Sequence, residues 1–244
     1  MIRSVPSRRW RPLARLAAIV LIVALVGRLW SGGYLDRRAI WRFPAETHAA
    51  RVDALFFSGD AGMRFGMGPF IARALAAHGV GVTAVGTSTL FRFGATRSDL
   101  DRRIADAVEQ AERTAGPRQL VVIGQSYGAD VLQTGLSHLP VALRHRIAAI
   151  VLVVPGTGTW FRADPFGLAY HLAPDSRSIG TVRAIDWAPL TCLYGVAETD
   201  SVCPLLRMPN ATIVGLPGGH YLNHDKPGVA AAVLRAAHVA PVGL

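Results

Sequence analysis

Short runs of apolar, largely β-branched residues alternate with longer amphipathic segments from residue 51 onward. Such runs are typical of buried parallel strands, and the longer segments are typical of helices that cover a sheet. The pattern predicts strands over 52–57, 80–85, 119–124, 147–154, 189–194 and 211–216, and helices over 68–78, 97–115, 127–137 and 227–238. This alternation predicts an α/β fold in which helices cover both faces of a mostly parallel sheet.

The predicted helix 97–115 has a recognisable start. Thr96 precedes it and Asp99 follows three residues later, which resembles an N-cap with a capping box. One face of this helix is apolar and is expected to pack on the sheet; it consists of Leu100, Ile104, Ala107, Val108 and Ala111.

The N-terminal region has the pattern of an export or membrane signal. A 12-residue apolar core, residues 16–27, follows five arginines and can extend through Trp30; these are Arg3, Arg8, Arg9, Arg11 and Arg15. No Ala-x-Ala cleavage motif is present, so we expect an uncleaved anchor, with a cleaved signal peptide as the alternative. The arginines place the N-terminus in the cytoplasm and the rest of the chain outside.

Three regions follow from these patterns: a signal or anchor over 1–30, a tether over 31–50, and one domain over 51–244. Within the domain, residues 155–188 are poorly patterned and rich in aromatic residues. They predict either an apolar wall for a lipid or a partner, or an irregular loop that buries its own aromatics. The short, proline-interrupted crossover over 200–210 has room for only a turn or two of helix.

The net charge of +10 would suggest a nucleic-acid partner if it were spread over the chain. Residues 1–42 contain nine Arg and one acid, which gives +8, and the rest contains 17 Lys or Arg and 15 acids, which gives +2. A domain this near to neutral lacks the basic surface that binds polyanions, so we expect no nucleic-acid partner.

The predicted strand 119–124 runs into Gly-Gln-Ser-Tyr-Gly, residues 124–128. A strand followed by Gly-x-Ser-x-Gly is the nucleophile elbow of α/β-hydrolases, in which a sharp turn exposes the serine above the sheet. The motif predicts an α/β-hydrolase fold with Ser126 as the nucleophile. The alternative is a glycine-rich strand–helix turn in an unrelated α/β protein.

A general base and an acid follow the serine in the order that this fold requires. His220 comes after the predicted strand 211–216 and a flexible Pro-Gly-Gly, and His224 is the alternative. Asp200 and Glu198 both follow the predicted strand 189–194. We favour Asp200 as the acid because Val202 and Pro204 follow it, and Glu198 stays open because it lies three residues after Gly195.

An anionic intermediate would need two backbone donors. We expect one from the Tyr127 amide and the other from Asp60 or Ala61, in the loop after strand 52–57. A phosphate-binding loop is the competing interpretation of this segment, but Gly-Lys-Ser/Thr is missing. The histidines and cysteines lack the spacing of metal ligands, and the chemistry needs no metal or cofactor.

The two cysteines, Cys192 and Cys203, bracket both candidate acids. Outside the cytoplasm such residues can pair, and a disulfide here would hold the acid loop against its strand. The alternative is two small buried thiols.

Several segments together resemble the bacterial virulence protein VirJ/AcvB family over about residues 51–235. They are Ser58–Asp60, Gly124–Asp130, Tyr194–Pro204 and Leu216–His220, with cysteines around the acid and Ala-Asp after the elbow. The chain departs from the family pattern at Ala61 and Met63, beside the predicted oxyanion loop.

The resemblance implies a periplasmic serine hydrolase with Ser126, Asp200 and His220 as its triad. It also implies removal of aminoacyl groups, notably lysyl, from phosphatidylglycerol, and a connection to type IV secretion. Asp60 or Asp130 could receive the ammonium group of such a substrate. The alternatives are that Asp60 holds its own loop by side-chain hydrogen bonds and that Asp130 packs behind its helix. Two other functions remain open: a non-catalytic secretion accessory that binds exported proteins, and a general carboxylesterase or lipase.

Overall fold

A seven-stranded sheet in the order β1-β3-β2-β4-β5-β8-β9 forms the centre of the fold. The computed structural model describes residues 10–47 and 50–238. β1 pairs antiparallel with β3, and the remaining neighbours pair in parallel. The strands of this sheet are β1 (Ile40–Phe43), β2 (Val52–Phe57), β3 (Val82–Val85), β4 (Gln119–Gln125), β5 (Ile147–Val153), β8 (Leu190–Gly195) and β9 (Ala211–Leu216). The mostly parallel sheet that the sequence predicts is confirmed.

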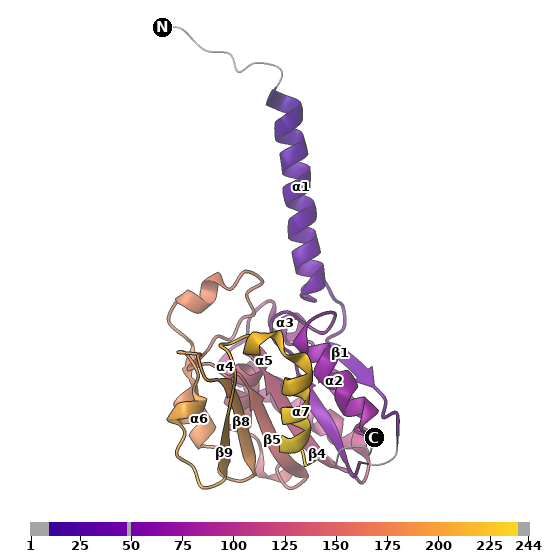
Figure 1. Ribbon diagram of the computed structural model, residues 1–244, viewed down its shortest axis with the longest axis vertical. Helices are drawn as coiled ribbons and strands as arrows, with labels where there is room; N and C mark the ends of the chain where they lie inside the picture. The colour runs from indigo at the N-terminus through magenta and orange to yellow at the C-terminus, as the bar shows by residue number, and fades with distance from the viewer. Residues whose placement is uncertain (1–9, 48–49, 239–244) are drawn as a thin grey trace.

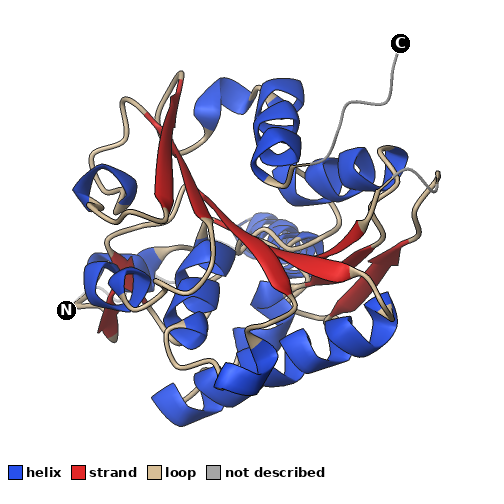
Figure 2. Cartoon of the chain, turned by 90° about the horizontal axis from the view of Figure 1, so that it is seen from below, coloured by secondary structure: helices blue, strands red, loops and turns tan. Residues whose placement is uncertain are grey.

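Helices cover both faces of the sheet (Figure 1 and Figure 2). α2 and α7 pack on one face, and α4, α5 and α6 pack on the other. β2 separates the two cores: Leu55 and Phe57 point toward α4 and α5, and Ala54 and Phe56 point toward α2 and α7. The helices are α1 (Trp10–Ser31), α2 (Met67–Ala77), α3 (Thr87–Phe91), α4 (Arg97–Ala115), α5 (Tyr127–Leu136), α6 (Ser178–Arg183) and α7 (Lys226–Ala236).

Each strand and helix expected between residues 51 and 238 is present, with bounds that differ by at most two residues. α4 begins as predicted, because the Thr96 side chain accepts a hydrogen bond from the Asp99 amide and the Asp99 side chain accepts one from the Thr96 amide. The crossover between β8 and β9 holds only the 3-10 turn η3 (Cys203–Leu205). Local sequence signals therefore set most of the elements.

The prediction that residues 31–50 form a tether is wrong, because part of this segment belongs to the sheet. Ile40–Phe43 forms β1 at the edge of the sheet, in register with β3. Trp41 and Phe43 pack on the core that α2 and α7 cover. Packing of these two partly buried rings favours the strand over a flexible linker, so the domain includes residues before 51.

Residues 155–188 combine both structures that were expected for them. They contain β6 (Gly158–Thr159) and β7 (Ser176–Arg177), which form a small antiparallel sheet, the turn η2 (Leu168–His171), and α6. Phe161 is buried in the core. Trp160, Phe166 and Tyr170 instead line a cavity of about 880 Å³. The segment thus supplies an aromatic wall.

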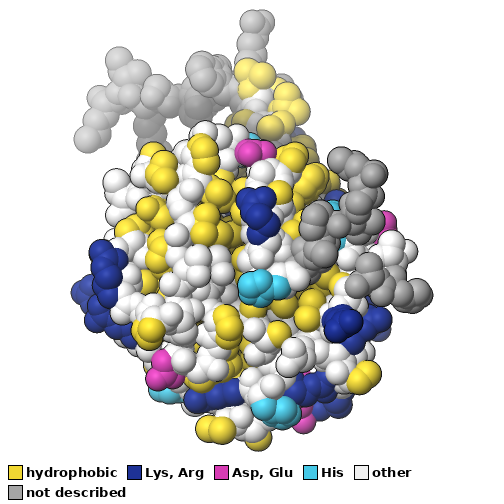
Figure 3. Space-filling view, turned by 60° about the horizontal axis from the view of Figure 1, so that its bottom comes forward, with side chains coloured by type: hydrophobic (Ala, Val, Ile, Leu, Met, Phe, Trp, Pro, Cys, Tyr) yellow, Lys and Arg dark blue, Asp and Glu magenta, His cyan; other side chains and the backbone are white. Residues whose placement is uncertain are grey.

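α1 projects from the domain, which it meets at its last turn (Figure 1). Over Pro12–Ser31 it is long and apolar enough to cross a membrane. Arg3, Arg8 and Arg9 of the expected basic segment lie outside the described residues, as do positions 239–244 of the expected domain. At the end of the domain away from α1, basic and acidic side chains are dispersed among uncharged ones (Figure 3).

Candidate active site

The nucleophile elbow forms between β4 and α5. Ser126 lies between them with φ at 51° and ψ at −129°, a conformation that costs energy for a residue with a Cβ. Backbone hydrogen bonds hold it in place: the Ser126 amide donates to Val153 O at 2.8 Å, and the Asp130 amide donates to Ser126 O at 3.1 Å. The hydroxyl is thereby presented at the carboxyl end of the parallel strands.

The two glycines of the motif are required for close packing. A Cβ on Gly128 would lie 2.2 Å from the carbonyl oxygen of Ser58, and one on Gly124 would lie 2.6 Å from the Ala129 Cα. α5 can therefore approach β2 and β4 only where these side chains are absent.

His220 meets the nucleophile. Its Nε2 lies 2.8 Å from Ser126 Oγ, so the imidazole is placed to accept the hydroxyl proton. His224, the alternative base, instead stacks on Tyr221 with ring centroids 5.6 Å apart. The structure brings Ser126 together with His220, across 94 positions of sequence.

Glu198, rather than Asp200, is the acid in contact with the base. Glu198 Oε1 lies 2.5 Å from His220 Nδ1, and the glutamate side chain is only 7% exposed. The Asp200 carboxylate accepts a hydrogen bond from the Thr157 hydroxyl instead. The prediction that Asp200 partners His220 is wrong, and the spacing of three residues after Gly195 was the correct signal.

The turn after β8 explains this choice. The Glu198 amide donates to Gly195 O at 2.8 Å, and the Ala197 amide donates to Gly218 O at 2.9 Å. Glu198 is thus held beside the loop that carries His220. Ser201, three residues later, already contacts the loop after β5, so Asp200 lies on the part of the chain that has turned away.

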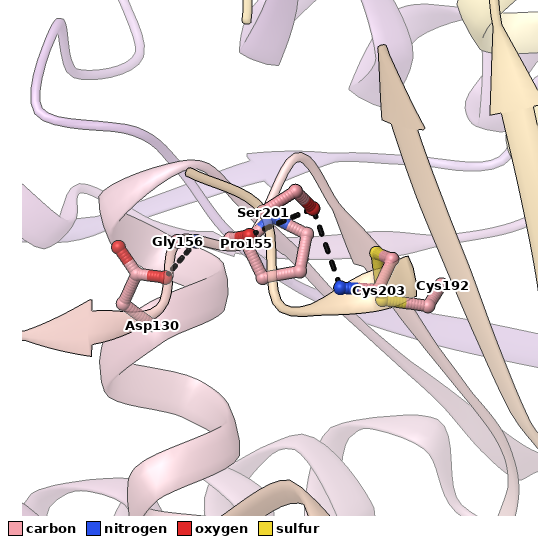
Figure 4. Close-up of a disulfide and its surroundings, with 6 residues drawn as sticks. All are labelled: Asp130, Pro155, Gly156, Cys192, Ser201 and Cys203. Atoms are coloured by element: carbon pink, nitrogen blue, oxygen red, sulfur yellow. Dashed lines mark hydrogen bonds between the residues drawn. A yellow bond between two sulfur atoms is a disulfide. The ribbon is translucent and has the colours of Figure 1, made fainter. Parts of the chain in front are cut away.

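A disulfide between Cys192 and Cys203 closes the loop that carries Glu198 (Figure 4). Ser201 adds a second connection, because its hydroxyl donates to Pro155 O at 3.2 Å and accepts from the Cys203 amide at 3.3 Å. The bridge spans 11 positions. In the chain-entropy model, closing a loop of this size raises the free energy of the unfolded state by about 3 kcal/mol. It fixes the acid loop to β8.

A cavity of about 880 Å³ opens at the Ser126 hydroxyl. Its aromatic wall is formed by Trp160, Tyr170 and Tyr127. The Trp160 and Tyr170 rings lie 5.3 Å apart, and Tyr170 stacks on Tyr127 at 5.9 Å. Aromatic faces of this kind bind apolar groups and also attract cations.

Two further carboxylates, Asp130 and Asp60, face the same cavity. Burial raises the pKa of Asp130 to about 8, although the Gly156 amide donates to its Oδ1 at 2.8 Å and opposes that rise (Figure 4). Burial also raises the pKa of Asp60, against the influence of Arg28 and His220. Asp130 thus faces the site, which the sequence left open. Arg28, which the sequence analysis did not associate with the site, lines the cavity as well.

The expected oxyanion donors lie close to the nucleophile. The Tyr127 amide is the first of α5, where a helix provides no acceptor of its own. Gly59, in the loop after β2, packs against the nucleophile, with its ideal Cβ position 3.5 Å from Ser126 Cβ. Hydrogen bonding to the backbone amides of Asp60 and Ala61 lowers the pKa of the Asp60 carboxyl, against the larger effect of its burial. A negative charge of the protein itself therefore occupies the neighbourhood of the second donor.

The part of the chain that the structure describes has no group of three or more His, Cys, Asp or Glu side chains placed to hold a metal ion. The cavity brings together a serine hydroxyl, an imidazole, carboxylates and backbone amides. Together they can activate a hydroxyl, accept its proton and stabilise a developing negative charge, which is the chemistry of acyl transfer.

The model of one protein family, described as bacterial virulence protein (VirJ), matches residues 52–240. No curated protein matches the sequence significantly.

The fold is that of known α/β-hydrolases. Est1E from Butyrivibrio proteoclasticus superposes with a TM-score of 0.56 at 13% identity, over 82% of this chain and 94% of that one. The esterase domain of a Rhodothermus marinus protein gives 0.54 at 16% identity, over 80% and 90%. The mature lipase BlEst2 from Bacillus licheniformis gives 0.55 at 12% identity, over 82% and 98%. The predicted α/β-hydrolase fold is confirmed.

Replacement of the acid distinguishes the two carboxylates after β8. We expect Glu198→Gln to lower kcat for ester hydrolysis about a hundredfold or more, because the amide no longer holds the imidazole in the required tautomer. Asp200→Asn, the matched control, should change it less than tenfold. Steady-state kinetics of the two purified variants provides the measurement, and the reverse order would contradict the assignment of Glu198.

The pH profile of the site should reflect the environment of His220. The hydrogen bond that His220 Nδ1 donates to the Glu198 carboxylate raises the pKa of His220 above its ordinary value of 6.5, although burial opposes this. Because only the neutral imidazole accepts the serine proton, kcat/KM should increase with pH through a midpoint above 6.5. In Glu198→Gln the midpoint of the residual activity should move to lower pH. An unchanged midpoint would mean that the carboxylate does not act on this histidine.

Proposed function

The chain belongs to the VirJ family of bacterial virulence proteins. We propose that it is a serine hydrolase that cleaves carboxylic esters. The observation that carries the proposal is the continuous hydrogen-bonded series from Ser126 through His220 to Glu198. The series ends at a cavity large enough for a small acyl group and part of its alcohol.

The reaction proceeds through an acyl-enzyme. Ser126 Oγ attacks the ester carbonyl carbon while His220 Nε2 takes the hydroxyl proton, and the negatively charged Glu198 stabilises the resulting imidazolium. Collapse of the tetrahedral intermediate breaks the bond to the alcohol oxygen, which receives the proton from His220. A water molecule then attacks the acyl-enzyme with His220 as base, which releases the carboxylic acid and restores the serine.

The oxyanion of both intermediates is bound by the Tyr127 amide and by an amide of the loop after β2, from Asp60 or Ala61. Each donor of this kind typically contributes about 3–4 kcal/mol to stabilisation of the transition state. The Asp60 carboxylate has to leave these amides when substrate binds. A cationic substrate that attracts the carboxylate would favour this movement.

The substrate class that best fits the cavity is an aminoacyl ester, and within it an aminoacylated phosphatidylglycerol such as the lysyl form. An aminoacyl group carries at least one ammonium close to the reacting carbonyl. Asp60 and Asp130 line the cavity beside the nucleophile, and the raised pKa of Asp130, about 8, falls when a cation binds next to it, so that this carboxyl ionises as the ammonium enters. The wall of Trp160 and Tyr170 supplies aromatic faces. Hydrolysis would release the amino acid and regenerate phosphatidylglycerol.

We place this reaction at the outer face of the bacterial inner membrane. The apolar α1 serves as the anchor, and the arginines before it keep the N-terminus in the cytoplasm. The Cys192–Cys203 disulfide is consistent with an oxidising compartment such as the periplasm.

A fluorophosphonate probe tests the nucleophile directly. The folded full-length protein should be labelled, and Ser126→Ala should abolish labelling because the reactive oxygen is removed. Ser98→Ala, which changes an exposed serine on α4 away from the cavity, should be labelled like the unmodified protein. Gel fluorescence measures the result. Absence of labelling in correctly folded protein would favour the non-catalytic role in binding exported proteins.

The ammonium preference has its own test. Lysine ethyl ester and ethyl hexanoate share one carbon chain and differ in the two amino groups. We expect the unmodified protein to prefer the lysine ester, and Asp130→Asn to reduce that kcat/KM ratio about tenfold, because the amide keeps the shape of the carboxyl but cannot ionise beside the ammonium. Asp186→Asn, on an exposed position outside the cavity, should leave the ratio unchanged. An unmodified protein without preference would indicate a general carboxylesterase.

A further inference from the structure

The last turn of α1 is fixed to the same end of the sheet as the nucleophile. The Arg64 Nε donates to Trp30 O at 3.0 Å, and its guanidinium lies 4.6 Å from the centre of the Trp30 ring. Directly after the helix, Gly33 O accepts a hydrogen bond from Thr89 Oγ1 at 2.7 Å. Arg64 and Thr89 lie on the segments that follow β2 and β3. The base of α1 is thus part of the catalytic end of the domain (Figure 1).

This connection determines how the cavity meets a membrane. A 20-residue helix is about 30 Å long, which matches the hydrocarbon thickness of a bilayer. If α1 crosses the membrane, its final turn lies at the bilayer surface, and the loops that contact this turn lie there too. The mouth of the cavity then faces the lipid headgroups.

Apolar side chains surround this mouth without being buried in the domain. Phe65 is 57% exposed, with its ring 6.1 Å from that of Trp30, and both Phe65 and Phe166 line the cavity. Further exposed apolar residues lie on the adjoining segments after α3 and around η2. We call the set the mouth rim; it consists of Phe65, Phe93, Phe166, Leu168 and Leu172. Aromatic and aliphatic side chains of this kind are stabilised at membrane interfaces.

Arg28, in the last turn of α1, lines the cavity on its membrane side. It is one of two Lys or Arg residues on a wall that otherwise carries carboxylates; the other is Lys226. A guanidinium forms paired hydrogen bonds with phosphate oxygens, and if α1 crosses the membrane, Arg28 in its last turn lies at the depth of the lipid phosphates. It would then balance the charge of a phosphodiester in the alcohol part of the substrate.

We propose that the cavity receives its ester substrate directly from the outer leaflet of the membrane that α1 crosses, with the mouth rim among the headgroups and Arg28 bound to the lipid phosphodiester. This inference rests on the proposed function for the nature of the bond that is cleaved. The contact with the bilayer and the binding of phosphate do not depend on catalysis, so each can be tested separately from hydrolysis.

Bilayer contact is measured with an environment-sensitive fluorophore on variants of the full chain that each carry one added cysteine, with the Cys192–Cys203 disulfide left intact. The protein is reconstituted in vesicles of phosphatidylcholine and phosphatidylglycerol that contain a spin-labelled quencher lipid. Leu168→Cys places the probe on the mouth rim, and Val141→Cys places it on the turn before β5, at the amino-terminal ends of the parallel strands and thus opposite the catalytic end. Both positions are similarly exposed, at 69% and 75%. We expect blue-shifted, quenched emission at position 168 only. If the probe at both positions emits at the wavelength typical of water and is not quenched, the proposed bilayer contact is overturned.

Phosphate binding is measured in the Ser126→Ala background, in which no turnover occurs. Full-length protein in detergent is titrated with glycerophosphoglycerol, the soluble headgroup of phosphatidylglycerol. Arg28→Gln should weaken binding about tenfold, and Arg37→Gln, which changes an exposed cation outside the cavity, should not. Equal affinity of the Arg28→Gln variant and its parent would overturn the role of Arg28.

In the active protein, Arg28→Gln should raise the KM for lysyl-phosphatidylglycerol about tenfold. The increase for lysine ethyl ester, which has no phosphate, should be at least fivefold smaller. If the unmodified protein hydrolyses neither ester, the proposed function fails, whereas the fluorescence and binding results still decide the present inference.

Discussion

The active site depends on two places where backbone packs against backbone with no room for a side chain. At the first, α5 touches the end of β2 through Gly128, which sets the position of Ser126. At the second, the loop before His220 crosses the end of β8 at Gly195, where a Cβ would lie 2.2 Å from Gly219 O. These approaches bring the nucleophile, base and acid within hydrogen-bond distance although they come from three strand ends. A larger residue at either point would move a whole loop and not only one side chain.

The electrostatics of the cavity follow from this crowding. Buried Glu198 holds the proton-accepting ring and raises its pKa, and buried Asp130 has its own pKa raised to about 8. Three carboxylates near one serine are costly unless cations are present, because each is shielded from water. In the resting protein Arg28 and His220 offset part of the charge of Asp60. A cationic substrate would offset the remaining negative charge, which would explain why these three carboxylates line one cavity.

The sequence determines the fold and two members of the site well. The apolar run before Gly124 and the glycines around Ser126 are local signals, and they predict a strand, a turn and a helix whatever surrounds them. The choice between Glu198 and Asp200 was not local, since it depends on where the turn after Gly195 ends and on the contact of Ser201 with Pro155. The strand Ile40–Phe43 was missed because a short segment at a sheet edge gains its stability from packing of Trp41 and Phe43. Arg28 was missed because only the docked position of α1 brings it to the cavity.

The joint between α1 and the domain has a kinetic consequence. Hydrogen bonds fix the carbonyls of Trp30 and Gly33, so the first residues after the helix do not form a free linker. If α1 crosses a membrane as proposed, a catalytic unit attached in this way cannot tilt far relative to the bilayer or move into the aqueous compartment. It would then encounter reactants by lateral diffusion in two dimensions, and its turnover would depend on their surface density. Dilution with inert lipid would slow it, whereas a change in bulk volume would not.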